Sequence, residues 1–171
     1  SAGANPLDVI EIARGLRQAR HEYDWLIVLV HGGREHYPYP SPRLQQVCRF
    51  LVELGAAAVV CQHSHCAGCY EYHHDAPIVY GQGNLVFDSP RARNASWHEG
   101  FLVRLTLLEP GRCTADWIPF SQGGAEPGAR RMPPEIQRDF LLRLAERSRE
   151  IAGEGAVERL WLEYCRSEKY L

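Results

Sequence analysis

The sequence lacks any apolar run long enough to cross a membrane. Its longest run, residues 25–30, is far shorter than the roughly 20 residues that a membrane-spanning helix needs. No charged-then-apolar leader opens the chain, so we expect no targeting segment. An excess of charge is also missing, because 19 basic residues face 21 acidic ones and leave a net charge of −2. We therefore expect no nucleic-acid partner, since proteins that bind nucleic acid carry a basic surface.

Two familiar groups of enzyme motifs are missing as well. His31-Gly32-Gly33 follows an apolar run, as the oxyanion loop of lipases and esterases does, but the Gly-x-Ser-x-Gly nucleophile elbow of those enzymes does not occur. Gly81-Gln-Gly83-Asn84 is too short for a dinucleotide-binding loop, and no P-loop is present. The sequence therefore excludes a serine hydrolase of that class and shows no site for a nucleotide cofactor.

The length and composition are those of one globular domain. Of the 171 residues, 45% are hydrophobic and 23% are charged, which rules out a disordered chain and allows a real core. Six cysteines would suggest a disulfide framework in a small secreted protein, but a chain of this size does not need one. We therefore expect free thiols and a cytoplasmic protein, with association with the cell envelope as the alternative.

The first half of the sequence predicts a βαβ unit. Residues 25–30 form a continuous β-rich apolar run, typical of a strand buried on both faces. Pro42 opens an amphipathic helix over 42–54, and a second apolar strand follows at 57–61. This order predicts two parallel strands with a right-handed crossover. A helix ending near Arg20 precedes the unit, and we expect this helix and the crossover helix to cover the two faces of the strands.

The second half predicts short antiparallel strands followed by helices. Gly, Asn and Pro divide the apolar stretches that we expect as strands, at 77–80, 85–87, 100–108 and 113–118. Apolar residues at helical spacing follow at 135–151 and 156–165. The predicted fold class is α/β, with a βαβ unit, mostly antiparallel strands and C-terminal helices. We divide the chain into a domain over 1–120, a loop or linker over 121–134 and a helical extension over 135–171.

Histidines follow both strands of the predicted βαβ unit. His31 ends the first apolar run, and His63-Ser-His65 comes after the second. Parallel neighbours place their carboxyl ends on one edge of the sheet, where ligands of open α/β folds bind. Three imidazoles at that edge would form a set of nitrogen ligands for a transition metal. The spacing alone leaves open an ordinary loop histidine and a chance His-x-His pair.

A structural zinc site is a second interpretation of the same region. Cys66-x-x-Cys69 has the spacing of a zinc knuckle. A closed site needs four ligands, and His73 and His74 would have to supply the second pair. Ordinary free thiols are the simpler interpretation, because free cysteine is a common small hydrophobic residue in cores.

The segment from Asp24 to Asp88 carries several blocks of a known family. The blocks are Asp24-Trp-Leu-Ile-Val-Leu-Val-His31-Gly-Gly-Arg-Glu35, His63-Ser-His65 and Gly83-Asn84-Leu-Val-Phe87-Asp88, with weaker matches at Gln45, Gly55-Ala56, Glu71, Pro77-Ile78, Tyr80 and Trp161-x-x-Tyr164-Cys165. Their order and spacing resemble the CapA family of poly-gamma-glutamate and capsule synthesis proteins.

The resemblance implies a calcineurin-like metallophosphoesterase fold with two divalent ions, which would be Mn, Fe or Zn. It implies that the metal ligands include His31, His63 and His65. Glu35 and Asn84 match family positions near the site, which implies that they support the ligands or contact the substrate. The implied function is a metal-dependent hydrolase of capsule or poly-gamma-glutamate biosynthesis that acts on a phosphoester or on a polyglutamate amide.

The sequence also departs from the family pattern. The Trp after the first histidine is Gly32 here, a Gly is replaced by Gln62 and a Pro by Ser64. The family's earlier motifs, which supply a bridging carboxylate, an amide ligand and an acid histidine, have no counterpart before Asp24. We therefore expect the C-terminal part of such a domain, which is silent alone and acts as an enzyme only with the upstream half. The alternative is a non-catalytic assembly or binding subunit with a degenerate metal site.

Overall fold

The computed structural model describes residues 7–87, 95–123 and 128–170. Residues 1–6, Asp88 of the CapA-like blocks and residues 124–127 of the predicted linker lie outside the described residues. The elements are α1 (Val9–Ala19), β1 (Leu26–His31), α2 (Pro42–Glu53), β2 (Ala56–Gln62), β3 (Tyr70–His73), β4 (Ala76–Val79), the 3-10 helix η1 (Ala95–His98), β5 (Glu99–Leu107), β6 (Cys113–Gln122), β7 (Ala129–Arg131), α3 (Pro134–Glu150) and α4 (Ala156–Ser167).

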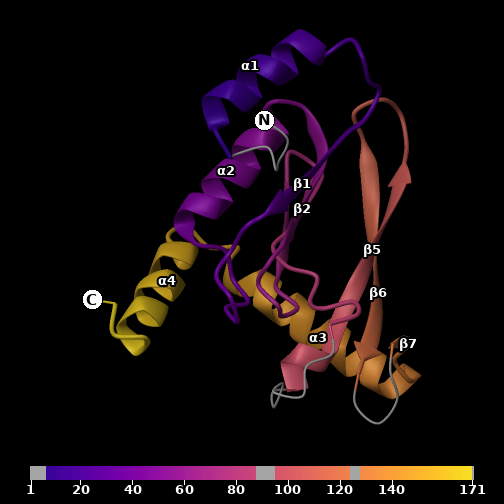
Figure 1. The fold of residues 1–171 in the computed structure, drawn as a ribbon, viewed down its shortest axis with the longest axis vertical. Helices are drawn as coiled ribbons and strands as arrows, with labels where there is room; N and C mark the ends of the chain where they lie inside the picture. Colours follow the sequence, from indigo (N-terminus) through magenta and orange to yellow (C-terminus); the bar gives the residue numbers. More distant parts are fainter. Residues whose placement is uncertain (1–6, 88–94, 124–127, 171) are drawn as a thin grey trace.

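The described strands form two sheets, and α1, α2 and α4 lie on the side of the first sheet that faces away from the second (Figure 1). The first sheet has the order β1-β2-β4-β3 and the second the order β5-β6-β7. Between α3 and the strands lies an apolar core, in which Phe140 and Leu144 of α3 pack with Phe101 of β5 and Val79 of β4. The predicted α/β class is confirmed. Among the described residues, no helix combines the length and apolar character that a bilayer crossing requires.

The predicted βαβ unit is also confirmed. β1 and β2 are parallel neighbours, and their register pairs His31 with Gln62. α2 connects the two strands, and its first turn is capped by the hydroxyl of Ser41, which accepts a hydrogen bond from the backbone amide of Leu44. The carboxyl ends of β1 and β2 therefore share one edge of the sheet, as the sequence predicts.

The cover of the first sheet differs from the prediction. α1 and α2 pack on the same face, because Ile12 of α1 and Leu51 of α2 share one apolar cluster with Val28 of β1. On the opposite face, Ile27 of β1 belongs to a cluster with Leu105 of β5, so the second sheet supplies that cover (Figure 1). Side chains alternate along a strand, and the apolar stripe of a helix does not show which face it will meet.

Two strands of the second half are missing from the prediction. β3 pairs antiparallel with β4, whereas β4 itself is parallel to β2, so this sheet is mixed. The β3–β4 turn consists of His74 and Asp75, which have φ of 47° and 66° and lack the glycine that marks most such turns. β7 lies inside the predicted loop 121–134 and pairs antiparallel with β6; three residues are too few to give a periodic signal.

The strand predicted at 85–87 does not form. The backbone amide of Phe87 instead donates to the side-chain oxygen of Gln122 at 2.9 Å, and the amide nitrogen of Gln122 donates to the carbonyl of Phe87 at 3.3 Å. One buried side chain therefore replaces the neighbouring strand as the hydrogen-bond partner of this segment.

Candidate metal centre

The strand-end histidines come together at the carboxyl edge of β1 and β2. His31 is the last residue of β1, and His63 follows β2 directly. Nε2 of His31 lies 3.2 Å from Nδ1 of His63. Two nitrogens bound to one tetrahedral zinc ion at about 2.0–2.1 Å would be roughly 3.3 Å apart. The pair therefore has the spacing of two ligands of one ion.

A carboxylate joins the histidines from the loop after β1. Ligand atoms of Glu35, His63 and His65 all lie within 4.8 Å of one another, with Glu35 exposed and both histidines half-buried. His31 is outside this set of three and reaches it through its contact with His63. The resemblance assigns Glu35 to the surroundings of the site, but its carboxylate here lies close enough to be a ligand itself.

Asn84 fixes the orientation of His65. Its side-chain oxygen lies 2.8 Å from Nδ1 of His65, and its amide nitrogen donates to the backbone carbonyls of His65 and Trp97 at 3.2 and 3.3 Å. Because both amide donations identify the nitrogen side, the oxygen must accept from Nδ1. His65 is therefore protonated on Nδ1, and its Nε2 lone pair is left for a ligand.

An aromatic wall stands beside His65. The rings of His65, Phe87 and Trp97 are neighbours, and each pair of centroids is 5.3 Å apart. His36 also contacts Trp97, at 5.9 Å between centroids. The sequence does not predict Trp97 and His36 as neighbours of the centre, because neither directly follows an apolar run or belongs to a CapA-like block. Phe87 is 52% exposed, so this wall offers a flat aromatic surface to a bound molecule beside the centre.

The loop that carries His63 and His65 is held in an unusual backbone conformation. Their φ angles are 118° and 55°, values that non-glycine residues seldom adopt and that cluster at functional sites. Ser64 between them is buried, its hydroxyl donates to the carbonyl of Cys66, and its own carbonyl accepts from the amide of His36 at 2.7 Å. The sequence leaves open an extended or turned His-Ser-His segment, and the structure has the turned one.

The cysteine pair does not form part of a metal-binding group. Cys66 and Cys69 are free and buried, and neither belongs to the metal-capable groups found among the described residues. Burial raises the pKa of both thiols, which disfavours the thiolate that zinc requires. The two histidines considered as their partners, His73 and His74, lie with Glu53 instead.

Other residues of the CapA-like blocks build structure rather than the centre. Glu71 accepts hydrogen bonds from the guanidinium of Arg49 and from the hydroxyl of Tyr80, and the amide of Gln45 approaches it at 3.4 Å. The hydrogen bond to Glu71 raises the pKa of Arg49. Burial raises the pKa of Tyr80. This network ties α2 to β3 and to the end of β4.

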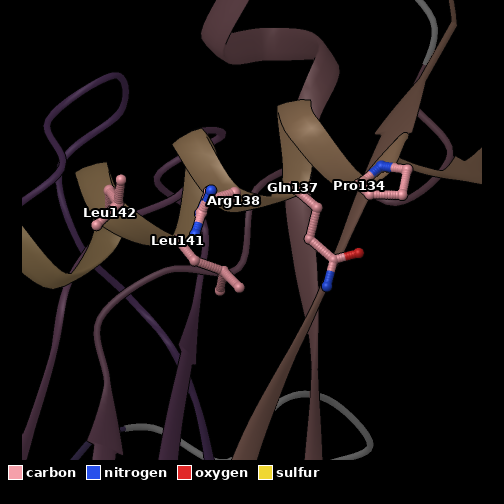
Figure 2. Close-up of a pocket in the computed structure, with 5 residues that line it drawn as sticks. All are labelled: Pro134, Gln137, Arg138, Leu141 and Leu142. Carbon is pink, nitrogen blue, oxygen red and sulfur yellow. The ribbon is translucent and has the colours of Figure 1, made fainter.

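A hollow of about 400 Å³ lies elsewhere, on the surface of α3. It is lined by Pro134, Gln137, Arg138, Leu141 and Leu142, which Figure 2 shows along one side of the helix. None of the candidate ligands contributes to this lining. The hollow therefore has no part in the chemistry proposed for the strand-end centre.

The arrangement at the strand ends suits one transition-metal ion. Imidazole nitrogens with a carboxylate favour zinc, nickel, copper or iron over magnesium and calcium, which prefer oxygen ligands. Glu35 is the one carboxylate of this group among the described residues. A pair of ions would need more oxygen ligands than these residues supply, since a bridging group and further ligands are required.

Comparisons with known proteins identify the family of the chain. The family model described as "Bacterial capsule synthesis protein PGA_cap" matches residues 1–89. The capsule biosynthesis protein CapA of Bacillus anthracis is 28% identical over 131 residues, which cover 74% of this chain and 31% of that protein. The chain thus spans about a third of the length of the curated relative that it matches. With the family match covering half of its length, the chain belongs to the bacterial capsule synthesis protein family PGA_cap.

Proposed function

We propose that this chain supplies the histidine side of a divalent metal centre in a capsule or poly-gamma-glutamate biosynthesis protein. The observation that carries the proposal is the convergence of His31, His63 and Glu35 with His65 at the shared end of two parallel strands. These residues come from the end of β1, the loop after it and the segment after β2, and they bring possible ligand atoms together at an exposed sheet edge. Three imidazoles and a carboxylate in such an arrangement are typical ligands of a transition metal.

A metal ion held there would polarise a bound oxygen and lower the pKa of a bound water, as in metallophosphoesterases. This chain's own residues would hold the ion and orient its ligands. His31, His63 and His65 would be nitrogen ligands, and Glu35 an oxygen ligand. Asn84 fixes the tautomer of His65 through its 2.8 Å contact. Phe87 and Trp97 form the apolar wall beside it.

The remaining oxygen ligands, and with them a second ion, are proposed to come from the upstream half of the same domain. β1 pairs with β2 and with no other strand of the described residues. Leu29 on β1 is 75% exposed, and a groove of about 610 Å³ runs along β1, lined also by Leu16 of α1. An added strand would pair with the free edge and cover Leu29.

The proposed reaction is hydrolysis of a phosphoester, with the polyglutamate amide as the second substrate class. A competing proposal is a non-catalytic assembly or binding subunit of the same biosynthesis. The side chain of Gln62, where the family pattern has glycine, favours this competitor, because it forms a hydrogen bond with Gln82 and occupies the strand end beside His63. Gly32 also favours the competitor, because it replaces the tryptophan that follows the first histidine in the family pattern.

The test compares this chain with a longer version that carries the upstream half. Both are loaded with Mn²⁺ or Zn²⁺ and assayed with bis-p-nitrophenyl phosphate. We expect hydrolysis by the longer version alone, and its loss in His63→Ala but not in the control His21→Ala, whose side chain is exposed beside the end of α1. Metal binding by the longer version without hydrolysis would support the assembly subunit. Turnover by the short chain would contradict the division of the centre between two halves.

A further inference from the structure

A second group of metal-capable side chains lies away from the strand-end centre. Ligand atoms of Glu53, His73 and His74 are all within 4.8 Å of one another. Nε2 of His73 is 3.1 Å from a carboxylate oxygen of Glu53, and the two imidazole rings are 4.3 Å apart between centroids. The three residues come from two elements, because Glu53 ends α2 and His73 ends β3.

The topology places this group at the opposite end of the sheet. β4 begins at Ala76 and runs parallel to β2, so the β3–β4 turn lies at the amino ends of these strands. α2 runs back from the carboxyl end of β1 to the amino end of β2, which brings Glu53 to the same place. His31, His63 and His65 stand at the carboxyl ends. The two groups therefore cannot share an ion.

The turn that carries His74 has positive φ angles at both of its central residues. His74 and Asp75 are the two central residues of the hairpin, with φ of 47° and 66°. Glycine, asparagine and aspartate are the usual occupants of such positions, and other residues cost about 1 kcal/mol or more there. His74 nevertheless occupies one of them and lies directly against His73.

The group is also open to ions from solution. The side chain of Glu53 is 49% exposed and that of His73 is 24% exposed. His74 lines a cavity of about 190 Å³ with Gly55 and Arg112, which leaves room for water beside the imidazole. An ion that bound here would meet three ligands on one side and solvent on the other.

We propose that Glu53, His73 and His74 bind one divalent transition-metal ion of the zinc class. Two imidazole nitrogens and one carboxylate oxygen select zinc, cobalt, nickel or copper over magnesium and calcium. Water completes the coordination, so this is an open three-ligand site rather than a closed four-ligand one. The ion fastens the β3–β4 hairpin to the end of α2. The proposal does not depend on the function proposed for the strand-end centre.

The experiment separates the two groups by mutation and uses the metal alone as the probe. Zn²⁺ is titrated calorimetrically, and Co²⁺ is followed by its visible absorption. One variant removes the strand-end ligands by His31→Ala, His63→Ala and His65→Ala together. The other carries His73→Ala and His74→Ala. Far-UV circular dichroism checks the fold of each, and His21→Ala is the matched control for loss of an exposed imidazole.

We expect the strand-end variant to keep one bound ion per chain and the Co²⁺ absorption of a mixed nitrogen and oxygen site. The His73→Ala, His74→Ala variant should lose that ion, and Glu53→Gln should weaken it at least tenfold. Zn²⁺ should raise the melting temperature of the strand-end variant, because an ion that binds only the folded chain stabilises it. A strand-end variant that binds no Zn²⁺, or binds it only at about millimolar concentration, would overturn the proposal. A His73→Ala, His74→Ala variant that binds as many Zn²⁺ ions per chain as the wild type would also overturn it.

Discussion

The side-chain oxygen of Asn84 lies 2.8 Å from Nδ1 of His65, and the amide nitrogen on the same side chain donates to two backbone carbonyls. Asn84 is buried, so these bonds are not exchanged for water. The contact decides which ring nitrogen of His65 carries the proton. A residue nineteen positions away in the sequence thus sets the direction of a candidate metal ligand.

Asn84→Ala should weaken Zn²⁺ binding at the strand-end centre by about tenfold to a hundredfold, the usual effect of losing a partner that orients a ligand. Asn84→Asp keeps an oxygen acceptor for Nδ1 but loses the amide donor to the carbonyls of His65 and Trp97. It should therefore lower the free energy of unfolding and yet keep more metal affinity than Asn84→Ala. Calorimetric titration in a His73→Ala, His74→Ala background isolates this centre. Equal losses in both variants would show that Asn84 acts only through the fold.

Gly83→Ala should destabilise the chain more than Gly111→Ala. Both glycines have φ of 79°, so each substitution places an L residue in the left-handed region at a cost of roughly 1–2 kcal/mol. A Cβ at position 83 would also lie 2.5 Å from the carbonyl oxygen of Glu99 and 2.9 Å from Cα of Gly100, whereas one at position 111 meets nothing within 4 Å.

Urea unfolding of the two glycine variants measures the difference directly. We expect Gly83→Ala to lose a further 1–3 kcal/mol, roughly the cost of overpacking, and to lose metal affinity because Asn84 is its neighbour. Equal free energies of unfolding would mean that the backbone at Gly83 can shift freely.

Glu71→Gln should lower the free energy of unfolding by about 1–2 kcal/mol. Its carboxylate accepts from Arg49 and Tyr80, and hydrogen bonds to a charged group are worth about 1.5–3 kcal/mol when buried. The Arg49 side chain is 39% exposed, which places the expected cost at the lower end. Glu109→Gln, which removes the exposed pair with Arg112, should leave the urea midpoint unchanged within error. Metal affinity should not respond to either substitution.

The thiols should be unreactive in the native chain. All six cysteines are buried and free, and burial raises the pKa of Cys66 and Cys69, so little thiolate forms near neutral pH. Ellman's reagent should leave them unlabelled over minutes, and denaturant should expose all six. EDTA should not change the rate at which Ellman's reagent labels the native chain. An increase with EDTA would instead support zinc at Cys66 and Cys69.

The sequence predicts that His31 and His63 meet because each follows an apolar run and a helix pattern lies between the two runs. That order predicts parallel strands, and parallel strands bring their ends to one edge, although β1 is less buried than its apolar run predicts. The position of Glu35 could not be derived in this way. It depends on the path of an irregular loop after β1, for which neither periodicity nor propensity gives a rule.

The parts that the sequence does not predict depend on contacts distant along the chain. β3 and its turn escape notice because the turn, His74-Asp75, contains no glycine and yet has positive φ at both residues. The sequence does not show whether a helix or the second sheet covers the Ile27 face of β1. Packing of Ile27 with Leu105 of β5 makes it the second sheet. Trp97 stacks on the ring of His65, although the two residues are far apart in the sequence. The sequence around Trp97 has no motif or periodicity that would predict this contact.

The position of His31 connects assembly to metal loading. His31 is the last residue of β1, the edge strand of the described sheet, and it also contacts His63 in the candidate centre. Pairing along that edge would use the backbone of β1, and metal binding would use the imidazole of its last residue. Linkage is reciprocal, so any factor by which strand addition tightens metal binding is the factor by which metal tightens strand addition. The concentration of free metal would then set how firmly the proposed upstream strand holds to this edge.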